Sequence, residues 1–458
     1  MVYRKKSDLA SKPADAKALA GKRVLVMGLG LHGGGAGTVR FLDSRGAKVT
    51  VTDLRTKKVL QPSLEKLKDI KGVTYVLGRH RESDFLKADL IVKNPGVPPT
   101  SPYLALAAKH KIPVTTDMGI FFRECPGTII GITGTRGKST TAWLIWKFLK
   151  TKHKRVFLGG NIRKSVLEFL SEIKQGDLIV LELSSFQLQD LSLDRVSPPI
   201  AVITNFMPDH MNWHRTMAEY AAAKSIIFKF QKPKDYLFAN PDDTRVRAMV
   251  PKARSHIVLP RLAPRYGTIV DKRLGAHYRS SVGLAIAVAR HFQIRPESIL
   301  NVLKRFRGLE GRQEQLPSVR GIRVINDTTA TIPEAAVAAI TRFRGLAKPP
   351  HRLTLIAGGS DKNLNFTPLA AAIAKYVDHL VLLPGAGTEK LKKALQKEKH
   401  SGAGVWHEAP SMPDAVTAAF AAAVKGDWIV LSPGAASFGL FVNEFDRGDQ
   451  FVKEMKKL

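Results

Sequence analysis

The segment GITGTRGKSTT, residues 131–141, brings glycines, a lysine and a run of hydroxyl side chains together between two apolar stretches. Backbone N–H groups in such a loop can cradle phosphates, Lys138 can reach the outer phosphates, and Ser139 or Thr140 can bind Mg²⁺. The usual spacing G-x-x-x-x-G-K-[ST] fails here, because the position of its first glycine holds Ile132. The loop alone therefore leaves two alternatives, a phosphate site and a turn without a ligand.

A second glycine-rich segment, GLGLHG at 28–33, follows the apolar run RVLVM and satisfies G-x-G-x-x-G. Asp53 lies 20 residues after Gly33, where the dinucleotide motif places an acidic residue on a ribose. The same loop could hold the diphosphate of any nucleotide, or it could be a tight turn. No acid–base pair of a dehydrogenase lies nearby in the sequence, so NAD binding is unsupported.

Short apolar runs that end in Gly, Pro, Asn, Asp or Glu predict the strands that must position these loops. They cover 23–27, 47–53, 90–96, 127–134, 177–183, 199–205, 352–359, 379–385 and 427–434. Helical patterns lie between many of them, for example at 140–150 and 413–425. The alternation predicts an α/β protein with mostly parallel sheets and ligands at the carboxyl ends of the strands.

Two breaks divide the chain, FFRECPG at 121–127 and a Gly-, Pro- and Arg-rich stretch at 306–323. They predict three α/β domains, 1–125, 126–311 and 312–458, each of ordinary domain size.

Composition narrows the class of protein further. The formal net charge is +33, from 72 Lys and Arg against 39 Asp and Glu, and the basic residues are dispersed, which does not favour dedicated nucleic-acid binding. No apolar run reaches the length of about 18 residues that a membrane span needs. A single cysteine, Cys125, fits a reducing compartment, so we expect a cytoplasmic protein.

The phosphate loop, TGTRGKST, resembles the shortened loop of the Mur ligases, with Arg136 at the place of a usual asparagine. These are ATP-dependent enzymes that add amino acids to the muramoyl stem peptide. Further segments resemble the family's motifs in the family's order along nearly the whole chain. They are NPGVP (94–98), GGN (159–161), LELSSFQL (181–188), NFMPDHMNWH (205–214), AAAKSIIF (221–228), NDTTAT (326–331), AGGSDKN (357–363) and SPGAASF (432–438).

Within the family, the resemblance is closest to the member that adds glutamate to UDP-N-acetylmuramoyl-L-alanine. It implies a Rossmann-like N-terminal domain for the UDP-substrate, a central P-loop-type ATPase domain, and a Rossmann-like C-terminal domain for the amino acid. It also implies ATP as co-substrate, two Mg²⁺ sites, an acyl-phosphate intermediate and a monomer that closes around its ligands. The D-isomer of glutamate is the preferred co-substrate.

The resemblance assigns roles to single residues. Lys138, His210 and Lys224 would be catalytic, with Lys224 carbamylated so that it acts as a carboxylate. The metal ligands would be Ser139, Glu182, His210 and Lys224. ATP would contact Gly134, Thr135, Arg136, Gly137, Lys138, Ser139, Thr140, Arg312 and Asp327. The UDP-substrate would contact Gly30, Leu31, His32, Asp53, Arg55, Asn94, Gly96 and Asn161. The amino acid would contact Thr331, Lys362 and Ser437.

The sequence also departs from the family motifs. The departures are at Tyr278, Ser281, Gly311, Thr329, Ile332, Gly439 and Glu444. They leave the phosphate and metal residues intact and affect the adenine contacts and the amino-acid pocket. A ligase for L-glutamate or another amino acid, or a non-catalytic nucleotide-binding homologue, therefore stays an alternative.

Overall fold

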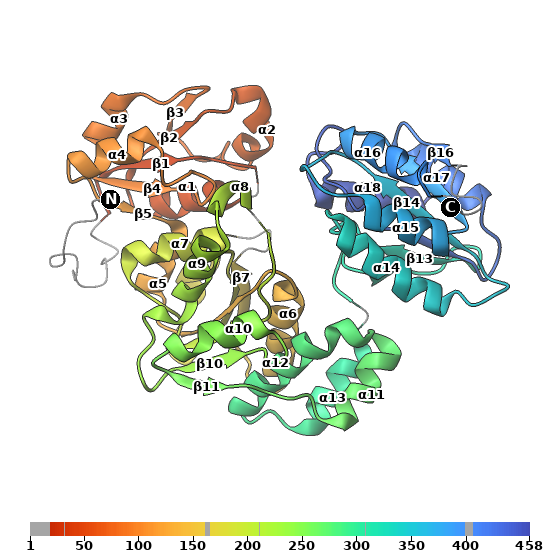
Figure 1. Ribbon diagram of the computed structural model, residues 1–458. Helices are drawn as coiled ribbons and strands as arrows, with labels where there is room; N and C mark the ends of the chain where they lie inside the picture. Colours follow the sequence, from red (N-terminus) through yellow and green to blue (C-terminus); the bar gives the residue numbers. More distant parts are fainter. Residues whose placement is uncertain (1–18, 32, 161–164, 210, 307, 399–405) are drawn as a thin grey trace. The chain divides into compact units, whose positions relative to one another are not determined.

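The computed structural model describes residues 19–31, 33–160, 165–209, 211–306, 308–398 and 406–458. Three sheets form the framework (Figure 1). By its internal contacts the chain divides into two compact units, one that extends to Lys272 and includes Ala276–Lys304, and one made of Arg273–Gly275 and Arg305–Leu458. The first two sheets belong to unit 1 and the third to unit 2.

The first sheet is parallel, with the strand order β3-β2-β1-β4-β5. Its strands are β1 (Arg23–Met27), β2 (Lys48–Asp53), β3 (Thr74–Leu77), β4 (Leu90–Lys93) and β5 (Val114–Thr115). Its helices are α1 (Gly34–Ser44), α2 (Lys57–Glu65), α3 (Glu82–Lys87), α4 (Pro102–Lys109) and α5 (Asp117–Glu124). The glycine-rich loop and Asn94 follow β1 and β4, and Asp53 is the last residue of β2. These three strands are adjacent in the sheet.

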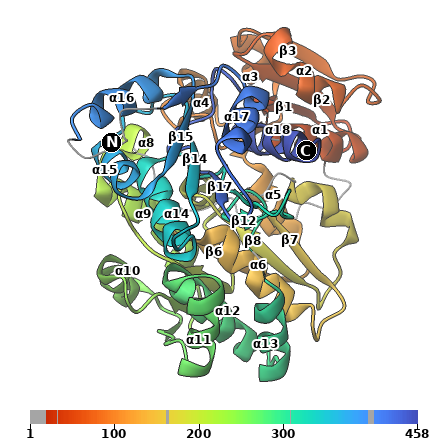
Figure 2. The ribbon, with the colours of Figure 1, turned by 90° about the vertical axis from the view of Figure 1, so that its right-hand side faces the viewer.

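The second sheet is also parallel, in the order β11-β10-β9-β6-β8-β7. Its strands are β6 (Thr128–Thr133), β7 (Val156–Gly160), β8 (Leu178–Glu182), β9 (Ile200–Ile203), β10 (Tyr236–Ala239) and β11 (His256–Val258). Its α-helices are α6 (Lys138–Leu149), α7 (Ser185–Asp194), α8 (Met211–His214), α9 (Met217–Lys229), α10 (Thr244–Met249), α11 (Pro264–Arg273), α12 (Arg279–His291) and α13 (Pro296–Arg305). Three short 3₁₀ helices are η2 (Val166–Glu172), η3 (Val250–Lys252) and η4 (Ala276–Tyr278). Helices α6 and α12 lie side by side (Figures 1 and 2).

The third sheet has the order β12-β13-β17-β14-β15-β16, and only its β12–β13 pair is antiparallel among the described strands. Its strands are β12 (Glu314–Gln315), β13 (Arg323–Asn326), β14 (Leu353–Gly358), β15 (His379–Leu383), β16 (His407–Glu408) and β17 (Trp428–Leu431). Its helices are α14 (Pro333–Leu346), α15 (Thr367–Tyr376), α16 (Ala386–Leu395), α17 (Met412–Ala421) and α18 (Glu444–Met455).

The first two sheets share one continuous apolar core. It contains Val24 and Val26 of β1 together with Leu181 of β8 and Ile203 of β9. The alternate residues of β1, Leu25 and Met27, are buried in a separate cluster with Phe85. The first sheet is therefore buried on both faces, as a parallel sheet covered by helices requires. The third sheet has separate cores, one around Leu355 and Val430 and one around Ile356 and Ile429.

The predicted α/β fold with mostly parallel sheets is confirmed, and all nine predicted strands are present, with bounds that differ by at most a few residues. Eight strands were missed, β3, β5, β7, β10, β11, β12, β13 and β16. Six of these are the edge strands of the three sheets. Edge strands are short and partly exposed, so they lack the continuous apolar run that identifies a buried parallel strand.

In the part of the chain that the structure describes, no helix is both long enough and apolar enough to cross a membrane.

Candidate active site

The phosphate loop connects β6 to α6 at the carboxyl edge of the second sheet. Gly137 occupies the N-cap position of α6 with a φ of 77°, and Gly134 has a φ of 152°. A Cβ atom at Gly134 would lie 1.9 Å from Oγ1 of Thr204, and one at Gly137 would lie 2.6 Å from Oγ of Ser281. Both glycines are therefore required by backbone conformation and by close packing.

Asn205, two residues after the end of β9, holds the loop from the neighbouring strand. Its backbone carbonyl accepts from the N–H of Thr135 at 3.0 Å, and its Oδ1 accepts from the N–H of Arg136 at 2.8 Å. Its Nδ2 donates to the carbonyl of Arg136 at 3.0 Å. The sequence alone predicted no role for Asn205, and only its place as the first residue of the NFMPDHMNWH segment could have indicated one.

Two lysines converge on this loop. Nζ of Lys138 donates to the carbonyl oxygens of Gly134 and Thr135, each at 3.1 Å. Nζ of Lys224, on α9, donates to the same Gly134 carbonyl at 2.8 Å. Lys224 is only 1% exposed, and its ammonium lies 4.6 Å from the centre of the Tyr220 ring.

Burial and then the neighbouring charge of Lys138 lower the pKa of Lys224 well below its usual value, while Asp209 and Glu182 act in the opposite direction. A lysine in this environment is readily neutral. The neutral amine is a nucleophile, and it is the form that reacts with CO₂ to give a carbamate.

Glu182 ends β8 and is 2% exposed; in the sheet register it stands opposite Ile132 of β6. Two residues later, Ser184 caps α7 with a capping box that it shares with Gln187. Oγ of the next residue, Ser185, lies 2.9 Å from Nε2 of His214, and the His214 ring stacks on the ring of Tyr220. Buried His214 is a second residue for which the sequence predicted no role, since a histidine in an aromatic segment gives no separate signal.

His210 lies outside the described residues. Within the described ranges, no three His, Cys, Asp or Glu side chains gather closely enough to hold a metal ion. Of the predicted metal ligands, Ser139 is half-buried in the first turn of α6, and Glu182 and Lys224 are buried. At the carbonyl of Gly134, Lys138 brings a positive charge, and Lys224 brings an amine without an anionic oxygen. Because Mg²⁺ prefers oxygen ligands, this donor set would fit the ion once Lys224 carried a carbamate.

The glycine-rich loop of the first sheet is held by Asp53. Oδ2 of Asp53 accepts from the N–H groups of Leu29 and Gly30, at 2.9 and 3.1 Å. Its Oδ1 accepts from the N–H of Arg55 at 2.9 Å. Asp53 is 5% exposed, and its carboxylate organises the loop. The predicted contact of Asp53 with the UDP-substrate stays a prediction.

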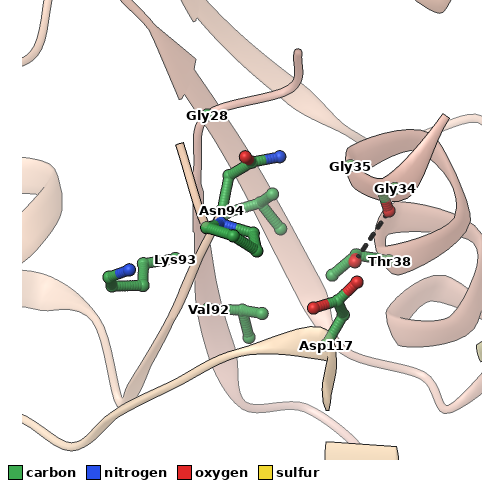
Figure 3. A pocket seen from close by; sticks show the side chains of 10 residues that line it. Gly28, Gly34, Gly35, Thr38, Val92, Lys93, Asn94 and Asp117 are labelled. Carbon is green, nitrogen blue, oxygen red and sulfur yellow. Dashed lines mark hydrogen bonds between the residues drawn. The ribbon is translucent and has the colours of Figure 1, made fainter. Parts of the chain in front are cut away.

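Asn94 faces this loop from the end of β4. A small pocket of about 10 Å³, enough for about one water molecule, lies between β1, the start of α1 and Asn94 (Figure 3). Asp117 closes one side of it, and Oδ1 of Asn94 accepts from the N–H of Gly96 at 3.0 Å. Leu31 is half-buried and Arg55 is exposed, whereas the predicted contacts His32 and Asn161 lie outside the described residues.

In unit 2, Asp327 follows β13 and is 5% exposed. Its carboxylate accepts from the N–H of Gln313 at 3.0 Å and from the hydroxyl of Ser432 at 2.8 Å. Burial raises the pKa of Asp327 to about 7, against these hydrogen bonds and the charges of Arg312 and Arg342. Arg312 is half-buried and lies in the segment between α13 and β12.

The predicted amino-acid residues belong to loops after β13, β14 and β17, three adjacent strands. The N–H of Gly434 donates to the carbonyl of Ala330, and Ser360 and Ala436 exchange two backbone hydrogen bonds, which join the three loops. Ser437 is buried, Thr331 is half-buried and Lys362 is exposed.

Arg447 ties two of these loops together, a role that its position in α18 did not reveal. It is 0% exposed, and its guanidinium donates to the carbonyl oxygens of Thr328 at 2.7 Å and Ala435 at 3.1 Å.

Two of the departures from the family motifs are in contact. Both the N–H and the hydroxyl of Thr329 donate to the carbonyl of Gly311, at 3.0 and 2.9 Å. A third departure, Ser281, packs against Gly137 of the phosphate loop. The replacements therefore form hydrogen bonds and packing contacts of their own.

Loops at the carboxyl ends of three largely parallel sheets, one of them a glycine-rich strand-to-helix loop beside two lysines, are typical of multidomain nucleotide-binding α/β proteins. Three family models match consecutive parts of the chain. They are the Mur ligase MurD-like N-terminal domain (22–116), the Mur ligase middle domain (132–281) and the Mur ligase glutamate ligase domain (311–434). The chain belongs to the Mur ligase family.

Full-length relatives agree with this. Two proteins named UDP-N-acetylmuramoylalanine–D-glutamate ligase, from Roseiflexus sp. (strain RS-1) and Borreliella afzelii (strain PKo), are 42% and 36% identical. Each match covers 94% of this chain, and 98% and 96% of the respective relative. The resemblance found in the sequence is confirmed.

Solved structures show the same fold. The UDP-N-acetylmuramate–alanine ligase of Thermotoga maritima has a TM-score of 0.62 at 16% identity, covering 95% of this chain and 99% of that protein. The MurF ligase of T. maritima in complex with ADP has a TM-score of 0.56 at 15% identity, covering 99% and 100%. The domain boundaries at 125/126 and 311/312 and the roles of single residues stay predictions.

Proposed function

We propose that this chain is an ATP-dependent ligase that joins D-glutamate to UDP-N-acetylmuramoyl-L-alanine in peptidoglycan precursor synthesis, in the cytoplasm. The observation that carries the proposal is the meeting of Lys138 and Lys224 at the carbonyl of Gly134 in a phosphate loop. The two relatives reported above support the choice of substrates, because their names state this activity and the similarity extends over nearly the full chain.

The chemistry must make a poor acyl donor reactive. The carboxylate of the substrate first attacks the γ-phosphorus of ATP, and ADP leaves. The amine of glutamate then attacks the acyl carbon, the tetrahedral intermediate collapses, and inorganic phosphate leaves with formation of the amide. Positioning and charge stabilisation dominate such phosphoryl transfer.

Residues of this chain supply both effects. The N–H groups of the loop and of the α6 N-terminus would bind the phosphates of ATP. Lys138 would leave the carbonyl oxygens that it now contacts and neutralise charge on the γ-phosphate. Arg312 and Asp327 would contact ATP from unit 2.

Mg²⁺ would neutralise phosphate charge when bound, and its ligands would be Ser139, Glu182, His210 and carbamylated Lys224. Oxygen ligands of this kind are the ones that Mg²⁺ prefers. The carbamate would form when the neutral amine of Lys224 adds to CO₂ and loses a proton, which turns a buried neutral group into an anion.

For the other substrates, Gly30, Asn94 and Gly96 would contact the UDP-sugar, with Asp53 fixing the loop. Thr331, Lys362 and Ser437 would bind glutamate, with the ammonium of Lys362 on a carboxylate.

The test is phosphate release by the purified protein with ATP, Mg²⁺ and UDP-N-acetylmuramoyl-L-alanine, comparing D-glutamate, L-glutamate and D-aspartate. We expect release that depends on D-glutamate. Release that depends on L-glutamate or D-aspartate would change the assigned amino acid, and no release with any of them would overturn the proposed activity.

The carbamate of Lys224 has a separate test. Protein exchanged into buffer depleted of CO₂ should lose most of its activity, and added bicarbonate should restore it. With ¹³C-labelled bicarbonate, a carbamate signal should appear in the NMR spectrum of the unmodified chain and be missing from the Lys224→Ala variant. Activity that does not respond to CO₂ would exclude a role for the carbamate.

A further inference from the structure

A buried ion pair links the two sheets of unit 1. Nζ of Lys93 lies 2.6 Å from Oδ2 of Asp190, and the side chains are only 3% and 9% exposed. Lys93 is the last residue of β4, and Asp190 lies on α7, 97 positions later in the sequence. Figure 3 shows the ammonium end of Lys93 turned away from the carboxyl group of Asp117.

Lys93 directly precedes the loop that is proposed to contact the UDP-substrate. The next residues, Asn94, Pro95 and Gly96, form this loop. Because this loop continues directly from β4, displacement of the end of β4 would displace Asn94 as well.

The position of Asp190 is equally informative. Helix α7 starts three residues after Glu182, and Oγ of its first residue, Ser185, lies 2.9 Å from Nε2 of His214. His214 stacks on Tyr220, which lies under Lys224. The helix therefore connects the Lys93 contact rigidly to the residues around the phosphate loop.

Helix α7 forms a second ion pair with the first sheet's part of the chain. Asp194, one turn after Asp190, pairs with Arg123 of α5, and Arg123 also donates to Thr115 of β5 at 3.0 Å. Both carboxylates lie on the same face of α7, since they are four residues apart. The second pair is more exposed, with Arg123 at 32%, so the Lys93–Asp190 pair is the better-shielded of the two.

We propose that Lys93 and Asp190 form a positioning pair that aligns the UDP-substrate loop of the first sheet with the phosphate-loop edge of the second sheet. This inference rests on the proposed function and extends it, because it assigns alignment of the two reacting substrates to residues outside the predicted substrate contacts. The expected consequence is that loss of the pair weakens use of the UDP-substrate while ATP binding is preserved.

The environment of the pair indicates that its contribution to the stability of the fold does not explain its presence. Burial raises the pKa of Asp190 to about 6, and the charges of Asp117 and Asp194 add to this shift while Lys93 opposes it. Replacing a buried ion pair by packed apolar residues is often neutral or stabilising. Stability alone would therefore be served as well by two apolar side chains at these positions.

That comparison provides the test. We would prepare Lys93→Met, Asp190→Leu and the double variant in the full chain, and measure thermal midpoints, KM for UDP-N-acetylmuramoyl-L-alanine, KM for ATP and kcat. The single variants should have lower thermal midpoints, because each removes one charge of the pair and leaves the other buried without its partner. The double variant should recover the midpoint but keep a KM for the UDP-substrate raised by about tenfold or more, with KM for ATP within about twofold.

The matched control is Asp89→Asn. Asp89 precedes the same strand, β4, and pairs with Arg23 at 2.8 Å, but at the opposite end from the substrate loop. It should leave both KM values within about twofold of those of the unmodified chain.

The outcomes are distinct. A double variant that recovers both the midpoint and the KM for the UDP-substrate would overturn the positioning role and leave the pair a stability element. Equal increases in KM for both substrates would also overturn it. If the unmodified chain itself shows no phosphate release, the proposed function has failed and this inference fails with it.

Discussion

At the scale of single residues, the carbonyl oxygen of Gly134 is the point at which two lysines meet in the phosphate loop. It accepts from both Lys138 and Lys224. Lys138 is half-buried at the start of α6 and can turn toward a phosphate, while Lys224 is buried beside the ring of Tyr220. Because their burial differs, we expect the two lysines to play different roles, Lys138 as a cation at the γ-phosphate and Lys224 as the carbamylated group.

Lys138→Met should abolish ligation and leave the first sheet's site unchanged. We expect kcat to fall by about 10²–10³-fold or more, because a preorganised cation at the transferred phosphate is lost. The Kd for UDP-N-acetylmuramoyl-L-alanine, measured by calorimetry without ATP, should change by less than about twofold. Lys150→Met, at the exposed far end of the same helix, is the control and should keep full activity. Undiminished turnover of Lys138→Met would contradict the assignment of the loop.

Asp327 should make stability depend on pH. Its folded-state pKa, about 7, is above the ordinary aspartate value of 3.8, so the folded protein holds the proton more tightly than the unfolded chain does. The stabilisation is complete below the unfolded pKa and is lost as pH rises through about 7, amounting to about 4 kcal/mol at most. Denaturant unfolding between pH 4 and pH 8.5 should show this decline, and it should be smaller in Asp327→Asn. Identical pH profiles for both proteins would exclude Asp327 as the source.

At the scale of elements, the strand order explains why the motifs work together. Strands β6, β8 and β9 are neighbours, so their carboxyl ends bring the phosphate loop, Glu182 and Asn205 to one edge. In the first sheet β2, β1 and β4 do the same for Asp53, the glycine loop and Asn94. Adjacent parallel strands always end on the same side, which makes that edge the natural place for a ligand.

Gly134→Ala should damage the loop, because a methyl group there would collide with Thr204 Oγ1 and lies in a backbone conformation that favours glycine. We expect destabilisation by about 1–3 kcal/mol together with loss of ATP binding. Gly267→Ala is the matched control, since α11 has open space around Gly267 and alanine is the better helix former by about 1 kcal/mol. Chemical denaturation and nucleotide titration of both variants measure these effects. Normal ATP affinity in Gly134→Ala would argue against nucleotide binding at this loop.

At the scale of the whole molecule, the cores decide which parts can fold independently. The first two sheets share a core, whereas the third has cores of its own on both faces. Units with separate cores commonly move relative to each other. An enzyme of the proposed kind needs such movement to admit three ligands and then exclude water from an acyl phosphate.

Residues 305–458 expressed alone should therefore fold. This segment, about 150 residues long, is large enough to bury its own core. Circular dichroism should show a cooperative thermal transition, and the midpoint should not respond to the UDP-substrate. A broad, non-cooperative transition would show that the third sheet depends on the rest of the chain.

Local patterns predicted much of this architecture. Buried parallel strands such as β6, β8 and β17 were identified because they are continuous apolar runs with turn residues at their ends. The phosphate loop, Lys224 and Asp327 were found through short motifs. Edge strands were missed, because their burial depends on which neighbour they pair with.

What the sequence by itself determined is the order of the motifs, the α/β alternation and membership of the Mur ligase family, since each depends on residues close together in the chain. The tertiary structure alone decided how those residues are used. It engaged the Asp53 carboxylate with the amides of Leu29 and Gly30, buried Lys224 against Gly134, and paired Lys93 with Asp190. Burial and pairing depend on contacts between residues tens of positions apart, and these contacts change the pKa and the hydrogen-bonding capacity that a side chain's type alone would suggest.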